Sequence, residues 1–408
     1  MSKTEKILLA INALLYGSLA IFSYSYVDLN LTISQNKLVL AFVNTMQQLG
    51  YFNRPTATLI YLIWIFLAFL FFIINLWLCY RSKVSLRYLA ISTVTNTLIL
   101  VFAYPFLSSD LFNYMFDAKI ILNYHASPYT HRPLDFPNDE WLRFMRWVHR
   151  YSPYGPLWLG MSLIPAFLGF GKFILNFLTF KIFIGVFHLL NTYLIYKILK
   201  KMNNKSYLLG TAFYAFNPLF LIEGVANAHN DVVLATFILL AIYLWVISKK
   251  AGAYLSIFLG ILIKYIPILN LPWLMFFHLR GERFSHLGGV QGKDFRRFIL
   301  LNLITMALFT YIFSSFKITI PFVSSGATQV QFQPWYLFWT LTLIALLDNM
   351  FLFVIAIALS LGASLRYLPY LYYGDWSHTG TIEFMTPITI IPPIIALIVV
   401  SLKKRFLK

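Results

Sequence analysis

The sequence has little of what a water-soluble or cross-linked protein needs. Cys79 is its one cysteine, which excludes a disulfide framework and a cysteine-based metal site. Only 11% of the 408 residues are charged, and 14 of them are Asp or Glu. A soluble domain usually has roughly a quarter charged residues. No linker rich in Gly, Pro or Ser interrupts the chain either, so residues 1–408 are predicted to form a single domain.

Hydrophobic residues instead make up 60% of the chain, aromatic residues 19%, and the mean hydropathy is +0.73. Apolar stretches of about 20 residues, long enough to cross hydrocarbon as helices, fall near 7–27, 57–80, 88–107, 173–197, 206–222, 232–247, 298–316 and 386–402. Shorter or proline-broken stretches lie at 156–171, 251–266, 267–279, 334–348 and 350–369. The sequence predicts an all-α polytopic membrane protein with about 12 transmembrane helices, in the range of about 11–13.

Basic residues are distributed unevenly over the predicted loops. The termini and short loops on one predicted side hold 20 of the 32 Lys and Arg residues but four of the 14 acids. The positive-inside rule makes that side cytoplasmic. The protein is therefore expected in the cytoplasmic membrane with both termini on the cytoplasmic side. The net charge of +18 is therefore an orientation signal, and no nucleic-acid partner follows from it. This asymmetry requires that 156–171 does not cross, so we expect a re-entrant or surface-lying segment there.

The longest predicted extracytoplasmic loop, 108–155, opens with "SSDLFNYMFDAKIILNY" (108–124) after the third predicted span. Asp110 follows a Ser-rich N-cap, and Asp110, Asn113, Tyr114 and Asp117 fall along one stripe of an amphipathic interfacial helix. Asp110 either caps this helix or acts as a general base for an acceptor hydroxyl. Asp117 is either solvated or a second acidic partner at the same site.

Three other motifs fall at predicted outer boundaries. "FNPLFLIEGVANAHNDVVLATF" (216–237) places Glu223, His229 and Asp231 between two spans, where they could contact Asp110, hydroxyls, phosphate or a metal. "HRYSPYGPLWLG" (149–160) and "QVQFQPWYLFW" (329–339) are rich in aromatic residues that stack on sugars or form an interfacial belt. The candidates for sugar contact are Tyr154, Gln333, Trp335 and Tyr336.

Cations also occur where a lipid phosphate would need them. Lys264 lies within the apolar stretch "ILIKYIPILNLPW" (261–273), broken by Pro267 and Pro272, and should face a cavity or a partner because a lysine at membrane depth costs about 3 kcal/mol. Arg146 and Arg150 are candidates for the same phosphate or for anionic headgroups. Lys181, by contrast, is expected to extend to the membrane surface. No metal site is assigned, although Asp, Glu, His and water would be compatible with Mg²⁺ or Mn²⁺.

Together these motifs resemble the polyprenyl-phosphate-mannose-dependent mannosyltransferases of the GT-C class. The resemblance runs from about Tyr104 to Trp339 and rests on five blocks in order: "SSDLFNYMFDAKIILNYHASPY", "YSPYGPLW", "NPLFLIE" with "AHND", "IKYIPILNLPW" and "QPWYLFW". This chain departs from the family where Asn113 replaces a frequent Arg and Asp117-Ala118 replaces Asp-Gly.

The resemblance implies a GT-C helical bundle with its active site on the extracytoplasmic face. It implies Asp110 as the catalytic carboxylate, His229 and Asp231 as its partners, and Lys264 as a donor-phosphate ligand. The expected reaction is inverting transfer of a hexose, mannose by resemblance, from a polyprenyl-phosphate sugar to a glycan or lipid-linked acceptor. A transporter or flippase of lipid-linked sugars is the rival interpretation, because proline-broken spans with a buried lysine also suit a midplane binding site. A structural scaffold explains neither Lys264 nor the acids.

Overall fold

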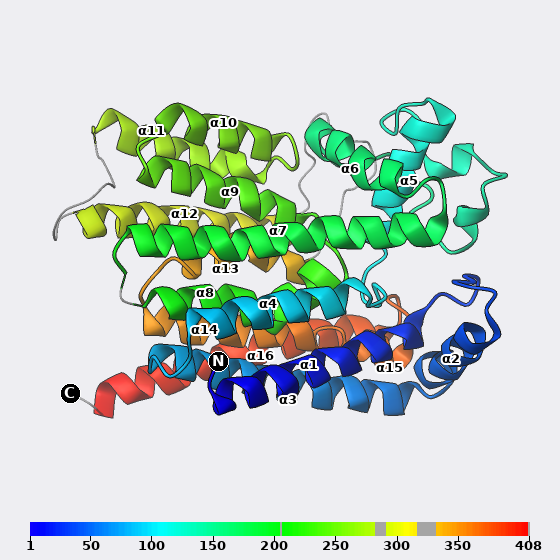
Figure 1. The fold of residues 1–408 in the computed structure, drawn as a ribbon, viewed down its shortest axis with the longest axis horizontal. Coiled ribbons are helices and arrows are strands. Elements are labelled where there is room, and N and C mark those ends of the chain that lie inside the picture. Colours follow the sequence, from blue (N-terminus) through cyan, green and yellow to red (C-terminus); the bar gives the residue numbers. More distant parts are fainter. Residues whose placement is uncertain (205, 282–290, 316–331, 407–408) are drawn as a thin grey trace.

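Helices account for the regular structure of this chain. The computed structural model describes residues 1–204, 206–281, 291–315 and 332–406, and within these ranges it contains no β-strand. Most helices run close to one common direction and form a single bundle (Figure 1). The prediction of an all-helical membrane protein is therefore confirmed for the described residues. Helices suit a bilayer because each one satisfies its own backbone hydrogen bonds.

The helices and helical turns follow one another along the chain as listed here. They are α1 (Lys3–Ser23), η1 (Tyr24–Tyr26), α2 (Lys37–Gln47), η2 (Gln48–Phe52), α3 (Arg54–Tyr80), α4 (Leu86–Val101), α5 (Asp110–Tyr124), η3 (Pro133–Asp135), η4 (Glu140–Arg143), α6 (Pro156–Leu168), α7 (Phe173–Lys201), α8 (Tyr207–Phe216), η5 (Phe220–Ala226), α9 (Asp231–Val246), α10 (Lys250–Ile261), η6 (Ile266–Asn270), α11 (Leu271–Leu279), α12 (Gln291–Ser315), η7 (Pro334–Leu337), α13 (Phe338–Ile344), α14 (Met350–Leu365), α15 (Leu368–Tyr373) and α16 (Thr379–Phe406).

Within the described ranges, six helices are long and apolar enough to cross a membrane, and a bent pair would make a seventh. The six are Lys3–Tyr26, Arg54–Tyr80, Phe173–Lys201, Lys293–Ile312, Met350–Tyr373 and Thr379–Leu402. Other apolar helices are shorter or interrupted. In 250–279, for example, Pro267 and Pro272 remove backbone donors and divide the segment into α10, η6 and α11. The expected count of about 12 spans therefore stays a prediction.

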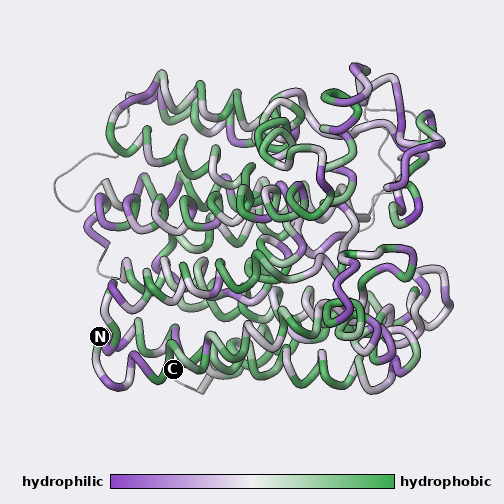
Figure 2. The backbone as a smooth tube through the Cα atoms, turned by 45° about the vertical axis from the view of Figure 1, so that its right-hand side comes forward, coloured by the Kyte–Doolittle hydropathy of each residue, from purple (hydrophilic) through white to green (hydrophobic). Residues whose placement is uncertain are grey.

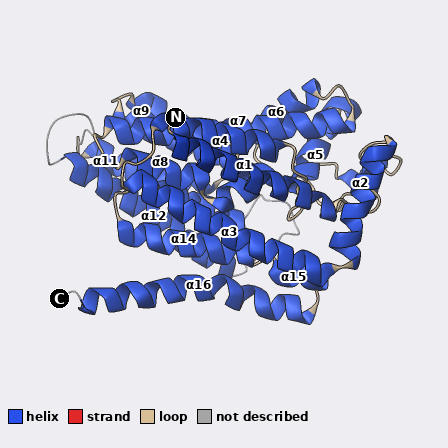
Figure 3. Ribbon diagram, turned by 60° about the horizontal axis from the view of Figure 1, so that its bottom comes forward, coloured by secondary structure: helices blue, strands red, loops and turns tan. Residues whose placement is uncertain are grey.

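The two chain ends lie at one end of the bundle, and α2, α5 and α6 lie at the opposite end (Figure 1). Apolar residues dominate the helices, whereas polar segments gather in the loops at both ends (Figure 2). The last helix, α16, runs along one edge of the bundle (Figure 3). Only 17% of its most apolar window is buried, which is the pattern of a helix facing lipid.

The segment at 156–171 folds mainly as α6, which lies beside α5 (Figure 1). Its first turn is held against the break after α10, where Gly155 N and Leu157 N donate to Ile263 O and Leu262 O, both at 2.9 Å. A helix of 13 residues is about 20 Å long, too short for a typical span. The re-entrant or surface-lying arrangement of this segment stays a prediction.

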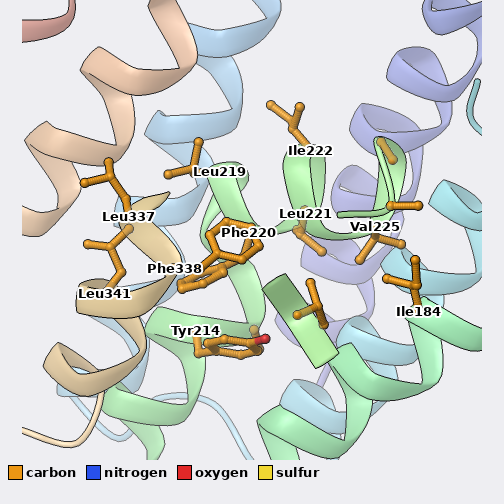
Figure 4. Close-up of a cluster of buried hydrophobic side chains, with 14 of the residues drawn as sticks. Ile184, Tyr214, Leu219, Phe220, Leu221, Ile222, Val225, Leu337, Phe338 and Leu341 are labelled. Carbon is orange, nitrogen blue, oxygen red and sulfur yellow. The ribbon is translucent and has the colours of Figure 1, made fainter. Parts of the chain in front are cut away.

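The centre of the bundle is built around the bent pair α8 and η5, whose axes differ by 55°. Phe220 of η5 packs between Tyr214 of α8 and Phe338 of α13, with ring centroids 4.3 and 4.5 Å away (Figure 4). η5 is a π-helical turn, a wide winding that often accompanies functional sites. It leads directly into the segment that bears His229.

Lys181 of α7 supports the same turn. Its side chain is fully buried, and its ammonium donates to the carbonyls of Val225, at 2.6 Å, and Ala226. The expectation that Lys181 reaches the membrane surface was wrong, because these free carbonyls at the end of η5 give the ammonium partners inside the bundle.

Candidate active site

A cavity of about 420 Å³ opens beside the N-terminus of α5. This is within the range of small-molecule sites, about 300–1,000 Å³. Its polar lining consists of Asp28, Ser108, Ser109, Asp110, Arg146, Gln333 and Arg366, and its aromatic lining includes Tyr51, Trp147, Trp335, Tyr367, Tyr370 and Trp376. The chain segments that form it come from residues 26 to 385, so the loop after α4 and the C-terminal helices meet here.

Asp110 is the first residue of α5 and lines this cavity with a side chain that is 20% exposed. Its backbone N–H donates to Ser108 Oγ at 3.2 Å, while Ser109, at the N-cap position, makes no side-chain capping bond. The helix N-terminus favours a negative charge at this position. Asp110 therefore begins a helix and also lines the cavity, and its role as a general base stays a prediction.

His229 links Asp110 to a second carboxylate. Its Nδ1 lies 3.4 Å from Asp110 Oδ2, and its Nε2 lies 3.2 Å from Glu223 Oε2. Glu223 also accepts a hydrogen bond from Asn227 Nδ2 at 3.0 Å, and the His229 backbone N–H donates to Glu223 O at 3.1 Å. We call Asp110, His229 and Glu223 the acid–imidazole chain.

Charge within the acid–imidazole chain shifts the pKa of its members. Burial lowers the pKa of His229, but the carboxylates of Asp110 and Glu223 raise it more, to about 9. Burial likewise raises the pKa of Asp110, yet contact with His229, and more weakly the charges of Lys264 and Arg150, bring it below its ordinary value. At neutral pH the structure therefore has an imidazolium beside an ionised Asp110.

The imidazole of His229 is also fixed from its face. The ring of Trp335 stacks on it with centroids 3.8 Å apart and an interplanar angle of 23°. Trp335 lines the cavity together with Gln333, so two of the four residues expected to contact sugar lie next to the acid–imidazole chain. An aromatic face beside an amide is a common surface for a sugar ring, which has both apolar and hydroxyl groups. Gln331, which belongs to the same motif, falls outside the described residues.

Asp231 and Lys264 form a separate buried pair. Lys264 Nζ donates to Asp231 Oδ2 at 2.6 Å, and Trp339 Nε1 donates to Asp231 Oδ1 at 2.9 Å. The Asp231 side chain is fully buried and that of Lys264 is 19% exposed. Lys264 thus has the partner that a cation at membrane depth requires, and neither residue lines the cavity. Asp231 contacts Lys264 and Trp339 here and makes no contact of this kind with His229.

Asp117 lies apart from the acid–imidazole chain, on the inner side of α5. It is 4% exposed, so the expectation of a solvated stripe along this helix fails at Asp117. Burial raises its pKa to about 7, and the neighbouring Ser152 opposes this only in part. The first three turns of α5 are mostly buried beneath the following loop and α6, and this explains why the acid does not reach water.

The remaining candidates lie around these two groups. Arg146 donates to the Tyr370 hydroxyl at 3.1 Å and lines the cavity. Arg150 stacks over Trp147, 4.2 Å from its centroid. Tyr154 packs edge-on against Tyr114. Another candidate, Tyr336, stacks on Trp339 at 4.7 Å, so it lies with the Asp231–Lys264 pair.

Sequence reasoning missed Arg366, a buried cation in the cavity wall. It lies in the apolar stretch 350–369, where an arginine near the end of a span is usually explained by the membrane surface. Tyr370 and Asp28, which also line the cavity, were missed as well. An arginine with few acids nearby was the one sequence signal available.

In the described part of the chain no group of three His, Cys, Asp or Glu side chains is arranged to hold a metal. Asp28 and Asp110 are the carboxylates that line the cavity. A divalent cation such as Mg²⁺ or Mn²⁺ stays a prediction without assigned ligands.

Fold and site together describe an all-helical membrane protein in which the Asp110 carboxylate lines a cavity at one end of the bundle and contacts the buried imidazolium of His229. The family model described as alpha-(1->6)-mannopyranosyltransferase, N-terminal domain, matches residues 14–280. The chain belongs to this family, and the resemblance to GT-C-type mannosyltransferases is confirmed. It is therefore a glycosyltransferase that uses a sugar donor and a glycan acceptor. No curated protein and no solved structure matches the chain significantly.

Proposed function

We propose that this chain transfers mannose from a polyprenyl-phosphate mannose donor to a hydroxyl of a glycan or glycolipid acceptor. The observation that carries the proposal is the position of Asp110, whose carboxylate lines a cavity and contacts the buried His229 in a member of a mannosyltransferase family. The family's name indicates an α-(1→6) product, so the acceptor group is the 6-hydroxyl of a sugar.

The reaction is a single displacement at the anomeric carbon. The acceptor oxygen forms a bond to the anomeric carbon. At the same time the bond between that carbon and the phosphate oxygen breaks, and polyprenyl phosphate leaves with the electron pair. The acceptor proton passes to Asp110, which is ionised at neutral pH. One displacement inverts the configuration, so an α product requires a β-linked donor.

His229 and Glu223 act on Asp110 in this scheme and make no contact with the reacting atoms. The imidazolium holds the Asp110 carboxylate in one orientation, and the buried Glu223 carboxylate keeps the imidazole charged. This is the logic of a catalytic group oriented by a second residue, which a third residue orients in turn. Positioning of this kind supplies a substantial part of an enzyme's rate.

The lipid-phosphate donor is supported by where the cavity lies. Its lining reaches α16, whose outer surface faces lipid, so a donor with a hydrocarbon tail can enter from the bilayer. Gln333 and Trp335 are placed to bind the sugar, with Tyr154 and Tyr336 farther from the cavity. Arg146, Arg150 and Lys264 remain the sequence-based candidates for the phosphate.

The membrane topology belongs to the same proposal. We place both termini on the cytoplasmic side and the cavity on the extracytoplasmic side of the cytoplasmic membrane. The support is the excess of basic residues at the end of the bundle that holds the termini. About 12 crossings and one domain over 1–408 complete this arrangement, and the contact of Trp335 with His229 joins the part beyond residue 280 to the part that matches the family.

The proposal is tested with the purified full-length chain in nanodiscs. Radiolabelled polyprenyl-phosphate mannose is supplied with an acceptor mannoside, and release of polyprenyl phosphate and formation of the disaccharide are both measured, with a nucleotide-linked mannose as the control donor. The expected result is equal release of lipid and formation of product with the lipid donor alone. Use of the nucleotide donor would contradict the proposal. Donor binding without any turnover, together with movement of the lipid across proteoliposomes, would favour the transporter interpretation.

A further inference from the structure

Arg366 is a buried cation with no carboxylate partner in the part of the chain that the structure describes. Its side chain is among the buried charged groups, with 8% of the residue exposed. Its side-chain hydrogen bond to Thr389 Oγ1 is long at 3.4 Å, and its guanidinium lies 5.5 Å from the centroid of Phe332. No carboxylate of the described residues lies within 4.0 Å of it. Because a buried, uncompensated charge is strongly unfavourable, a bound anion would stabilise this site.

A second cation lines the same cavity. Arg146 donates to Tyr370, whose ring stacks on Trp376 with centroids 4.0 Å apart. No carboxylate within the described ranges is close enough to form an ion pair with Arg146 either. Two guanidinium groups on one cavity match the oxygens of a phosphate, since arginine binds such groups through paired N–H donors.

Lys264, another of the cations expected to bind the phosphate, does not line this cavity. Its ammonium is already neutralised by Asp231 at 2.6 Å. An anion that approached Lys264 would have to compete with a buried carboxylate at hydrogen-bond distance. Neither arginine has a carboxylate within 4.0 Å among the described residues, although Asp28 and Asp110 line the same cavity, so the arginines are the better anion ligands.

The cavity also has an apolar side that leads toward lipid. Ile382 and Met385 of α16 contribute to its lining, and most of α16 is exposed on the outside of the bundle. Ile382 itself is 55% exposed. A ligand with a phosphate between the arginines therefore has a route for a hydrocarbon chain past this helix into the bilayer.

We propose that Arg366, with Arg146, binds the phosphate of a prenyl-chain lipid phosphate, with the chain leaving the cavity past Ile382 and Met385. Asp110 lines the same cavity, so the group attached to that phosphate lies on the side of the acid–imidazole chain. The assignment rests on the proposed function, because it names the residues that hold the donor and its lipid product. The same chemistry would also accept a phospholipid headgroup or inorganic phosphate, which the test separates.

The test measures binding of polyprenyl phosphate, the lipid product, because binding then does not depend on turnover. The full-length chain in neutral-lipid nanodiscs is titrated with polyprenyl phosphate, phosphatidic acid or inorganic phosphate, and quenching of tryptophan fluorescence is recorded, since Trp335 and Trp376 line the cavity. Arg366→Gln is compared with Lys264→Gln. Arg143→Gln is the control. Arg143 is an exposed arginine of the loop that also holds Arg146, and it pairs with Glu140.

Arg366→Gln is expected to weaken polyprenyl phosphate binding about 10- to 100-fold, the effect of losing a charged hydrogen bond, whereas Arg143→Gln leaves it unchanged. Phosphatidic acid and inorganic phosphate are expected to bind more weakly than polyprenyl phosphate. If Arg366→Gln does not fold, Arg146→Gln and Arg366→Lys supply the same comparison, with a smaller loss in each. Binding by Arg366→Gln equal to wild type, or a loss confined to Lys264→Gln, would overturn the assignment, as would equal binding of all three ligands.

The outcome is separable from that of the proposed function. Arg366-dependent binding of polyprenyl phosphate, without transfer of any mannose, would leave this site standing and remove the function. Mannose transfer by wild type together with undiminished binding and transfer by Arg366→Gln would leave the function standing and remove the site.

Discussion

The buried Lys264–Asp231 ion pair is predicted to stabilise the fold. The two side chains meet at 2.6 Å, and Asp231 is fully buried against Trp339. Replacing Lys264 by Met removes the cation and leaves the carboxylate in the bundle with the Trp339 N–H as its remaining donor. Breaking a buried pair in this way typically costs about 3–5 kcal/mol.

The reverse substitution has a smaller expected effect. Asp231→Asn keeps a group that can accept the hydrogen bond from Trp339, and Lys264, with its side chain 19% exposed, can turn toward solvent. We expect a loss of about 1–3 kcal/mol for this variant. The double variant, Lys264→Met with Asp231→Asn, should be more stable than the sum of the single losses indicates, because neither charge is then left without its partner.

These differences are measured as unfolding free energies of the full-length chain in mixed micelles, with thermal midpoints as a second readout. Lys172→Met is the matched control, because Lys172 is exposed at the start of α7 and forms no ion pair within the described part of the chain. A loss below about 1 kcal/mol in Lys264→Met, or strictly additive losses in the double variant, would refute the buried-pair argument.

Three further predictions follow from the charges and close contacts of the site. Glu223→Gln removes a charge that helps to raise the pKa of His229 to about 9. The loss of activity at high pH should therefore begin about one pH unit lower than in wild type, and an unshifted pH profile would show that Glu223 and His229 do not interact. Because the pKa of Asp117 is raised to about 7, the folded state binds this proton more tightly than the unfolded state, and stability falls as pH rises from about 4 to 7. Asp117→Asn should therefore raise the thermal midpoint more at pH 8 than at pH 5. A larger gain at pH 5 would contradict the assignment. Gly155→Ala should destabilise the chain by about 1–3 kcal/mol, because the added Cβ would lie 2.2 Å from a backbone carbonyl oxygen after α10. The control Gly160→Ala should be tolerated, because a Cβ there would have nothing within 4 Å. Equal thermal midpoints for the two variants would count against the contact at Gly155.

The membrane character and the main catalytic candidates could be predicted from the sequence for a simple physical reason. Apolar stretches show which segments enter lipid, and acids or histidines at their ends must then gather at one face of the bundle. Asp110, His229 and Glu223 were singled out on this ground, and they do form a connected group. Trp335 and Gln333 were also expected at the same boundary and line the cavity.

The pairing of charges could not be read from the sequence. Asp231 looked like a partner of His229 because the two are near in the chain, but the break after α10 brings Lys264 back against α9. Lys181 looked like a surface lysine because nothing in its own helix reveals the carbonyls of η5 that face it. Burial of Asp117 depends on how the following loop covers α5, which periodicity along one helix does not report. Such contacts depend on tertiary packing between segments far apart in sequence.

Asp110→Asn tests the central claim most directly. The substitution keeps the size and hydrogen-bonding shape of the side chain but removes its capacity to take up a proton. With polyprenyl-phosphate mannose and acceptor present, kcat should fall about 10²- to 10⁴-fold while binding of the donor changes little. Retention of kcat within about tenfold of wild type, with product still formed from the lipid donor, would contradict the claim that Asp110 accepts the acceptor's proton.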